Sequence, residues 1–254
     1  MNERFKDFFC GCVSYYIEKY LISFFMFHYA IKNLMLVVLG ITAISSGSIK
    51  SGQGHIENAS EAAVYYAIIR YGILFVFNAF DGCILLYSKR PQQAPQNWQQ
   101  IFIPLLSSYF MLSYNFTDAL PEWMTTTYVP QHWLWGMLLI SCFFVIGGEI
   151  VGLIAVFYLR RSFAVFVQVR DVVLRGPYRY VRHPIYMGHA MLAIGVLLSN
   201  FCIAYALISV MHIGLLAYRA RLEEMMLAAN DSAYRKSMEQ TGFMFPKLSV
   251  FTVS

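Results

Sequence analysis

The run RGPYRYVRHPIYMGH (residues 175–189) places basic side chains beside aromatic and turn-forming residues, between two apolar stretches. The Gly-Pro pair at 176–177 predicts a turn, and Pro184 suits the first position of a helix while keeping His183 out of the helical conformation. Arg182 and His183 would then stand at a helix N-terminus, whose free N–H groups and partial positive charge attract anions. The run therefore predicts a binding site for a carboxylate or phosphate group.

Other side chains of this run also fit a bound ligand. Gly188 would keep one face of the first helical turn open, Tyr186 would point toward the same region, and Tyr178 and Tyr180 could stack on a flat ring. A simpler explanation is a basic membrane anchor with interfacial tyrosines. An anchor accounts for the arginines but not for Gly-Pro, His-Pro and Gly188 in one run, so a functional site is favoured.

A second polar cluster, YRARLEEMMLAANDSAYRK, occupies residues 218–236. Arg219 and Glu223 are four positions apart and can pair along a helix, which gives these two a structural explanation. Glu224 is left over, and adjacent acids near a basic cluster can accept hydrogen bonds from ribose hydroxyls or an amino group. This cluster, which also contains Arg221, would lie beside the first one. The two clusters together fit a ligand that carries a positive and a negative charge.

The elements that must position these clusters are membrane helices. The chain has 254 residues, of which 58% are hydrophobic and 13% charged, whereas soluble domains average about 25% charged residues. An α-helical span needs about 20 apolar residues. We expect an all-α polytopic membrane bundle of about six spans, with a C-terminal amphipathic helix. The expected spans are 20–45, 61–87, 100–116, 133–158, 184–199 and 201–218.

The last two spans should form a tight helical hairpin, because the turn between them can only be Ser199-Asn200. This hairpin would bring the second cluster beside the first. Residues 159–182 hold six arginines against one aspartate, so the positive-inside rule places both termini, the active site and the amphipathic helix in the cytoplasm. Residues 1–19 mix charges with aromatics, as an interfacial helix would.

Four ionisable residues lie inside the expected spans, namely Lys32, Arg70, Asp81 and Glu149. Each costs several kcal/mol unless it is paired or hydrated. Lys32 could pair with either acid, and both a structural and a substrate-binding role stay open. A GxxxG motif at residues 148–152 favours close helix packing.

Composition and spacing argue against several other classes of protein. The basic residues flank apolar segments rather than lining a polar face, so no nucleic-acid partner is expected. No predicted strand leads into a GxGxxG turn, which argues against a Rossmann cofactor site. His183 and His189 are six positions apart and the other histidines are scattered, so no metal site is expected.

The motif R-G-P-Y-R-Y-V-R-H-P-x-Y-x-G at 175–188, followed by R-L-E-E-x-x-L at 221–227, resembles the isoprenylcysteine carboxyl methyltransferase and phospholipid methyltransferase superfamily. An R-S-F triplet at 161–163 resembles a further stretch of that family, and the likeness covers about residues 157–248. Arg160 stands where the family usually has glycine.

The resemblance implies an integral membrane methyltransferase that uses S-adenosylmethionine, bound by the hairpin and the C-terminal helix. It suggests two parts, membrane spans in 1–156 and a methyltransferase-like region in 157–254. By motif position, the cofactor-binding residues would be Tyr178, Arg182, His183, Pro184, Tyr186, Gly188, Glu223 and Glu224. The residues expected at the reaction are Arg182, Arg219, Arg221 and Glu224.

Methyl transfer from a sulfonium is an in-line displacement in which the leaving thioether needs no acid. A carboxylate acceptor needs no base, so the protein would mainly align the partners and exclude water. His183, Arg182 and the helix N-terminus would hold the methionine carboxylate, and Arg219 or Arg221 would orient an anionic acceptor. An amine acceptor would need a base, for which only the two intramembrane acids are candidates.

Carboxyl O-methylation of an isoprenylcysteine-type acceptor that enters from the bilayer is the first choice of function. Phospholipid N-methylation and thiol S-methylation are alternatives within the same class. Membrane sterol reductases share a related C-terminal region, so an NADPH-dependent reductase-like protein is a second alternative. A non-catalytic scaffold or transporter is a third, although it would not need both polar clusters.

Overall fold

A computed structural model describes residues 12–46 and 56–247, which fold into helices without a strand. Four helices are long and apolar enough to cross a membrane: Cys12–Ser45, Val64–Leu86, Leu134–Ser162 and Ile203–Asn230. A shorter apolar helix spans Pro184–Ser199. The expected all-α membrane bundle is confirmed, with residues 1–11 of the expected interfacial helix outside the described residues.

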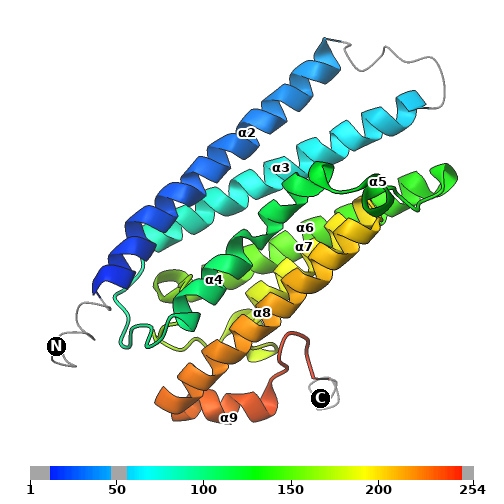
Figure 1. Cartoon of the computed structure of the whole chain (residues 1–254). Coiled ribbons are helices and arrows are strands. Elements are labelled where there is room, and N and C mark those ends of the chain that lie inside the picture. Colours follow the sequence, from blue (N-terminus) through cyan, green and yellow to red (C-terminus); the bar gives the residue numbers. More distant parts are fainter. Residues whose placement is uncertain (1–11, 47–55, 248–254) are drawn as a thin grey trace.

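The first two long helices run side by side in opposite directions (Figure 1). They are α2 (Ser23–Ser45) and α3 (Ile56–Leu86), and glycines of both helices mark their contact. Residues 12–19 are not a separate interfacial helix, because Cys12–Ser45 is continuous through η1 (Ile17–Ile22). The difference arises because Glu18, read as an interfacial charge, is fully buried against the rest of the bundle.

The expected third span is divided into two shorter elements. These are α4 (Gln99–Tyr109), which contains Pro104, and the 3₁₀-helix η2 (Phe110–Ala119). Within η2, the hydroxyl of Ser113 donates to the carbonyl of Phe110 at 2.6 Å. Such side-chain bonds to nearby carbonyls compete with regular helix geometry. Two short elements, α5 (Glu122–Thr125) and η3 (Gln131–Trp133), then lead into α6.

Small residues bring α6 (Leu134–Leu159) and α7 (Pro184–Ser199) into close contact. A side chain added at Gly148 or at Gly188 would collide with the backbone of the other helix. The hydroxyl of Ser141 also donates to the carbonyl of Gly195 across this contact, at 2.6 Å. Gly188 therefore serves helix packing, and the expectation that it keeps a helix face open is wrong because α6 covers that face.

The predicted hairpin is present, formed by α7 and α8 (Ile203–Asn230) (Figure 1). Helix α8 ends at Asn230, well past the expected end of the sixth span at residue 218. After α8 the chain turns into α9 (Ser232–Gln240), whose N-cap Asp231 accepts a hydrogen bond from the Tyr234 backbone at 2.9 Å. The following segment returns to the start of α7, where Arg182 N–H donates to the carbonyl of Gly242 at 2.9 Å.

Between α6 and α7 the chain forms η4 (Arg160–Ser162), an extended stretch and η5 (Gly176–Arg179). Gly176 confirms the predicted turn, because it has φ +61° and lies against the Tyr158 ring, where a side chain would collide. Arg160 is the one described non-glycine residue with positive φ, at 49°.

Replacing Arg160 with glycine is expected to stabilise the protein by about 1 kcal/mol, because a positive φ strains any residue with a Cβ. Thermal unfolding in detergent measures the change. Arg161→Gly is the matched control, since its φ is not positive, and it should not stabilise. A lower unfolding temperature for Arg160→Gly than for wild type would contradict the prediction.

Candidate functional site

One cavity of about 570 Å³ lies between the helices and the segment that links α6 to α7. Its hairpin side is formed by side chains from both predicted clusters and from α9, namely Tyr178, Arg182, His183, Tyr186, Arg219, Glu223 and Tyr234. Its span side carries the four intramembrane ionisable residues, Lys32, Arg70, Asp81 and Glu149. The two polar clusters therefore line the same cavity, as the sequence predicts.

His183 stands at the N-cap of α7 with φ −123° and ψ 62°, outside the helical region as Pro184 predicts. Its ring stacks on Tyr186, with centroids 5.4 Å apart and planes within 12°. Phe243 packs edge-on from the other side at 5.3 Å. The ring is held in place by two aromatic side chains, and its two nitrogens face the carboxylates of α8, with Nε2 3.4 Å from Glu224 and Nδ1 3.8 Å from Glu223.

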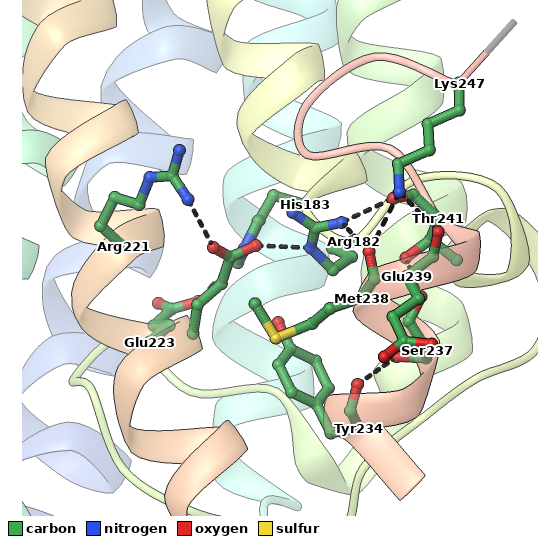
Figure 2. A network of polar contacts seen from close by, with 11 residues as sticks. Arg182, His183, Arg221, Glu223, Tyr234, Ser237, Met238, Glu239, Thr241 and Lys247 are labelled. Carbon is green, nitrogen blue, oxygen red and sulfur yellow. Dashed lines mark hydrogen bonds and ion pairs between the residues drawn. The ribbon is translucent and has the colours of Figure 1, made fainter.

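Arg182 connects α8 to the end of α9. Its Nε donates to Glu224 at 2.5 Å, and its Nη1 donates to the carbonyls of Thr241 at 2.6 Å and Met238 at 3.2 Å. Figure 2 shows this side chain between the α8 carboxylate and the α9 backbone. Lys247 reinforces the same helix end by donating to the Glu239 carbonyl at 2.6 Å. Arg182 therefore ties the end of α9 and the residue after it to α8.

Glu224 is not the free acid that the sequence suggested. It accepts from Arg182 and also from Arg221, whose Nη1 lies 3.1 Å away, and the Nε2 of His183 is 3.4 Å away. Glu224 is paired because the α7–α8 hairpin places Arg182, just before α7, opposite Glu224 on α8. Neither Glu224 nor Arg221 belongs to the cavity wall, and the Arg221 guanidinium lies over the Phe243 ring at 4.4 Å.

Glu223 does face the cavity and confirms one predicted contact. The Nε of Arg219 lies 3.3 Å from its Oε1, the expected pairing of residues four apart on a helix. The hydroxyl of Tyr186 also donates to Glu223. This carboxylate is the acid of the hairpin side that remains available to a ligand in the cavity.

Arg219 is buried and bound to protein groups through each of its nitrogens. Nη1 donates to the Ser108 hydroxyl at 2.9 Å and Nη2 donates to the Val165 carbonyl at 2.6 Å. Its guanidinium also lies over the Tyr186 ring at 5.0 Å. These contacts tie α8 to α4 and to the segment after α6, so they favour a positioning role over a direct grip on an acceptor.

Tyr178 and Tyr234 place buried hydroxyl groups at the cavity. Burial, followed by the nearby charge of Glu223, raises the pKa of Tyr178 well above its ordinary value. Burial and the two glutamates of α8 likewise raise the pKa of Tyr234. Neither hydroxyl has a hydrogen-bond partner in the structure. Both phenols therefore stay protonated at neutral pH and can donate a hydrogen bond to a ligand.

Three residues of the first cluster lie away from the cavity wall. Pro184 is fully buried at the start of α7, Gly188 packs on α6, and Tyr180 is 45% exposed. Their predicted contacts with a ligand have no counterpart in the lining of the cavity.

Sequence reasoning missed a buried ion pair that supports this wall. Glu18 of η1 and Arg170 of the α6–α7 segment pair, and both side chains are almost fully buried. Glu18 also accepts from the Phe166 backbone N–H at 2.9 Å and from the Gln168 amide at 2.5 Å. Arg170 is one of the six arginines of residues 159–182 that the positive-inside rule assigns to the membrane surface. A signal for the pair was the acid Glu18 within an aromatic-rich N-terminal segment.

The comparison with protein families gives one match. Residues 139–229 match the model of the isoprenylcysteine carboxyl methyltransferase (ICMT) family, a family of integral membrane methyltransferases. The matched region runs from α6 to the end of α8 and includes His183 and Glu223. It confirms the resemblance read from the two motifs, while the division at residues 156 and 157 stays a prediction. The comparison with curated proteins gives no match.

Proposed function

We propose that this protein transfers a methyl group from S-adenosylmethionine to a lipid-linked acceptor, with the carboxyl group of an isoprenylcysteine-type lipid as the first candidate. The observation that carries this proposal is the hairpin side of the cavity, where the hydroxyls of Tyr178 and Tyr234 are buried without hydrogen-bond partners. Unpartnered buried polar atoms are rare because each costs free energy. A ligand with several polar groups would satisfy them.

The residues present fit the zwitterionic methionine part of this cofactor. His183 and the N–H groups at the start of α7 suit its carboxylate, and Glu223 suits its ammonium group. The neutral hydroxyls of Tyr178 and Tyr234 suit acceptor atoms of the ribose or base. Arg182 and Glu224, expected to contact the cofactor, are proposed to act by positioning His183 and α9.

The bound cofactor would supply an activated methyl group. The chain itself needs to hold the acceptor oxygen in line and to exclude water, since neither general acid nor base is required for a carboxylate acceptor. Tyr186 and Phe243 pack on the His183 ring and keep it buried. The acceptor would reach the same cavity from the bilayer.

The distribution of lysine and arginine supports a cytoplasmic position for both termini and for the hairpin side. The cofactor is soluble in water, so this orientation would let it enter from the cytoplasm while a lipid enters between helices. The four long helices expose large apolar side chains, which membrane lipid would cover.

Calorimetric titration of the detergent-purified chain with S-adenosylmethionine, its demethylated product and NADPH tests the proposal. Saturable binding of the adenosyl compounds without NADPH is the expected result. Binding of NADPH alone would instead indicate the reductase-like function, and no binding by folded protein would indicate a scaffold or transporter. An acceptor screen then separates carboxyl, amine and thiol substrates.

His183→Ala is expected to weaken S-adenosylmethionine binding at least about tenfold, because a charge-assisted hydrogen bond contributes about 1.5–3 kcal/mol. The same titration measures the loss. His132→Ala is the matched control, because His132 is exposed in η3, apart from the cavity wall. Unchanged cofactor affinity in folded His183→Ala protein would contradict the assignment of this residue.

A further inference from the structure

Lys32 of α2 is a cation without an ion-pair partner at the edge of the cavity. Its pairings with Asp81 or Glu149 that the sequence allowed do not form. Among the described residues, the ion pairs within 4.0 Å include none of these three side chains. Lys32 lines the cavity, yet it is also exposed on a membrane helix. An unpaired charge inside a span costs several kcal/mol and usually marks a functional site.

Exposed residues in the wall of a cavity mark the places where it opens. Of the described residues that line this cavity, only Lys32, Asn115 and Asp171 are exposed. Asp171 lies in the segment between α6 and α7, which the positive-inside rule assigns to the cytoplasm. Lys32 lies in α2 and Asn115 in η2, within the expected first and third spans. These positions indicate one opening toward the cytoplasm and a second one toward the bilayer.

The second opening lies at the seam where α2 meets α4 and η2. At one end of this seam, Met26 of α2 and Leu105 of α4 pack against the same apolar cluster. Farther along, the rings of Tyr29 and Tyr109 face each other with their centroids 6.1 Å apart. These contacts close the seam on the side where α4 begins.

Beyond the two tyrosines, α2 and η2 each pack on α3. Val37 of α2 lies beside Gly72 of α3. Tyr114 of η2 belongs to an apolar cluster against which Leu74 of α3 packs, and no described residue of α2 belongs to that cluster. Lys32 follows Tyr29 by about 4.5 Å of helix rise. It therefore lies where the seam opens.

We propose that the seam between α2 and η2 is the entrance by which an amphiphile with an anionic head group reaches the cavity from the bilayer, and that Lys32 binds this head group. Asp81 and Glu149 line the same cavity but are only 4% and 3% exposed. The charge that faces the bilayer here is therefore the ammonium group of Lys32. The Asn115 amide can donate a hydrogen bond to the same head group.

The occupant must be an amphiphile, because the entrance lies between two membrane elements where a water-soluble anion has no access. Phe116, next to Asn115, is 71% exposed and suits the apolar chain of such a molecule. The entrance itself rests on packing and exposure. That the entering amphiphile is the methyl acceptor rests on the proposed function.

Photolabelling of the full chain in phosphatidylcholine nanodiscs tests the entrance. The probe is a palmitate with a diazirine in its chain, and the corresponding alcohol is its uncharged match. We expect the acid to label α2 and η2 near Lys32 and Asn115 about tenfold more than the alcohol does, the usual scale of one charged hydrogen bond. Lys32→Gln should remove this preference, whereas Lys236→Gln, at an exposed position in α9, should keep it. Equal labelling by acid and alcohol in the wild type, or an unchanged preference in Lys32→Gln, would overturn the proposal.

A removable cross-link tests whether the seam is the route. In a chain whose native cysteines are replaced by serine, Tyr29→Cys and Tyr109→Cys are joined by a short bis-thiosulfonate linker. The linked protein should lose labelling of Leu192 and Leu216 in the inner wall, and reduction should restore it. Affinity for S-adenosylmethionine should not change, because the cofactor would enter by the opening at Asp171. Full inner labelling of the linked protein would contradict the entrance, and the comparison of acid with alcohol still decides if this variant does not fold.

Competition distinguishes the acceptor from a resident lipid. N-acetyl-S-farnesylcysteine, which represents the first candidate acceptor, should displace the palmitate probe from the entrance. Displacement by phosphatidylglycerol alone would identify a resident-lipid site and overturn the role in admitting the acceptor.

The two proposals fail separately in these experiments. Binding of S-adenosylmethionine without a preference for the acid probe would leave the methyltransferase proposal standing and remove the entrance. Labelling that depends on Lys32, in protein that binds no adenosyl compound, would keep the entrance and remove the methyltransferase proposal.

Discussion

Arg170→Ala is expected to lower the free energy of unfolding by about 3–5 kcal/mol, the usual cost of breaking a buried ion pair from one side. The substitution leaves the Glu18 carboxylate with Gln168 and two backbone N–H groups, in a position without solvent. The Phe163 carbonyl also loses its guanidinium donor. Chemical denaturation in detergent micelles measures the change.

A double variant and a surface pair make this prediction specific. Glu18→Gln with Arg170→Met removes both charges and keeps similar volumes, so it should be more stable than Arg170→Ala alone. Lys89→Ala breaks the pair of Lys89 with Asp171, whose side chains are about half exposed and 2.5 Å apart. Exposed pairs contribute little, so an equal loss of stability in Lys89→Ala would contradict the argument.

The consequence of losing this pair reaches the cavity. The segment that Glu18 holds contributes Val165 to the wall, and the Val165 carbonyl accepts a hydrogen bond from Arg219 at 2.6 Å. Arg219 in turn pairs with Glu223 on the hairpin side. We therefore expect Arg170→Ala to weaken cofactor binding as well, although Arg170 lies outside both motifs.

Local sequence rules predicted the parts of the site that depend on neighbouring residues. Pro184 fixed the start of α7 and the conformation of His183, and the spacing of Arg219 and Glu223 predicted their pairing. The short turn at Ser199-Asn200 between the last two expected spans sufficed to predict the hairpin. Each of these inferences rests on the fixed geometry of a helix or a turn.

Long-range pairings were not predictable in the same way. Glu224 and Arg182 are 42 positions apart, and Glu18 and Arg170 are 152 positions apart. Nothing in the local pattern distinguishes Arg170 from the arginines that stay at the surface. Gly188 was misread for a related reason: only the packing of α6 on α7 shows that its missing side chain serves a helix crossing.

Arg182→Ala is the second prediction with a large effect, because it removes several interactions at once. Glu224 loses its 2.5 Å partner, and the carbonyls of Thr241 and Met238 lose their shared donor. The segment after α9 then keeps its backbone bonds to Arg182 and His183 but not the side chain that holds it. We expect affinity for S-adenosylmethionine to fall by about 2–3 kcal/mol, or 30- to 150-fold.

Limited proteolysis distinguishes this positioning role from direct contact with the cofactor. If Arg182 acts by holding α9 and the return segment, Arg182→Ala should be cleaved near residues 240–247 faster than wild type, with and without ligand. Arg221→Ala is the control, since Arg221 also pairs with Glu224 but its side chain is 63% exposed and contacts no α9 carbonyl. Loss of affinity with wild-type cleavage would instead indicate that Arg182 contacts the cofactor itself. That result would restore the role first read from its position in the motif.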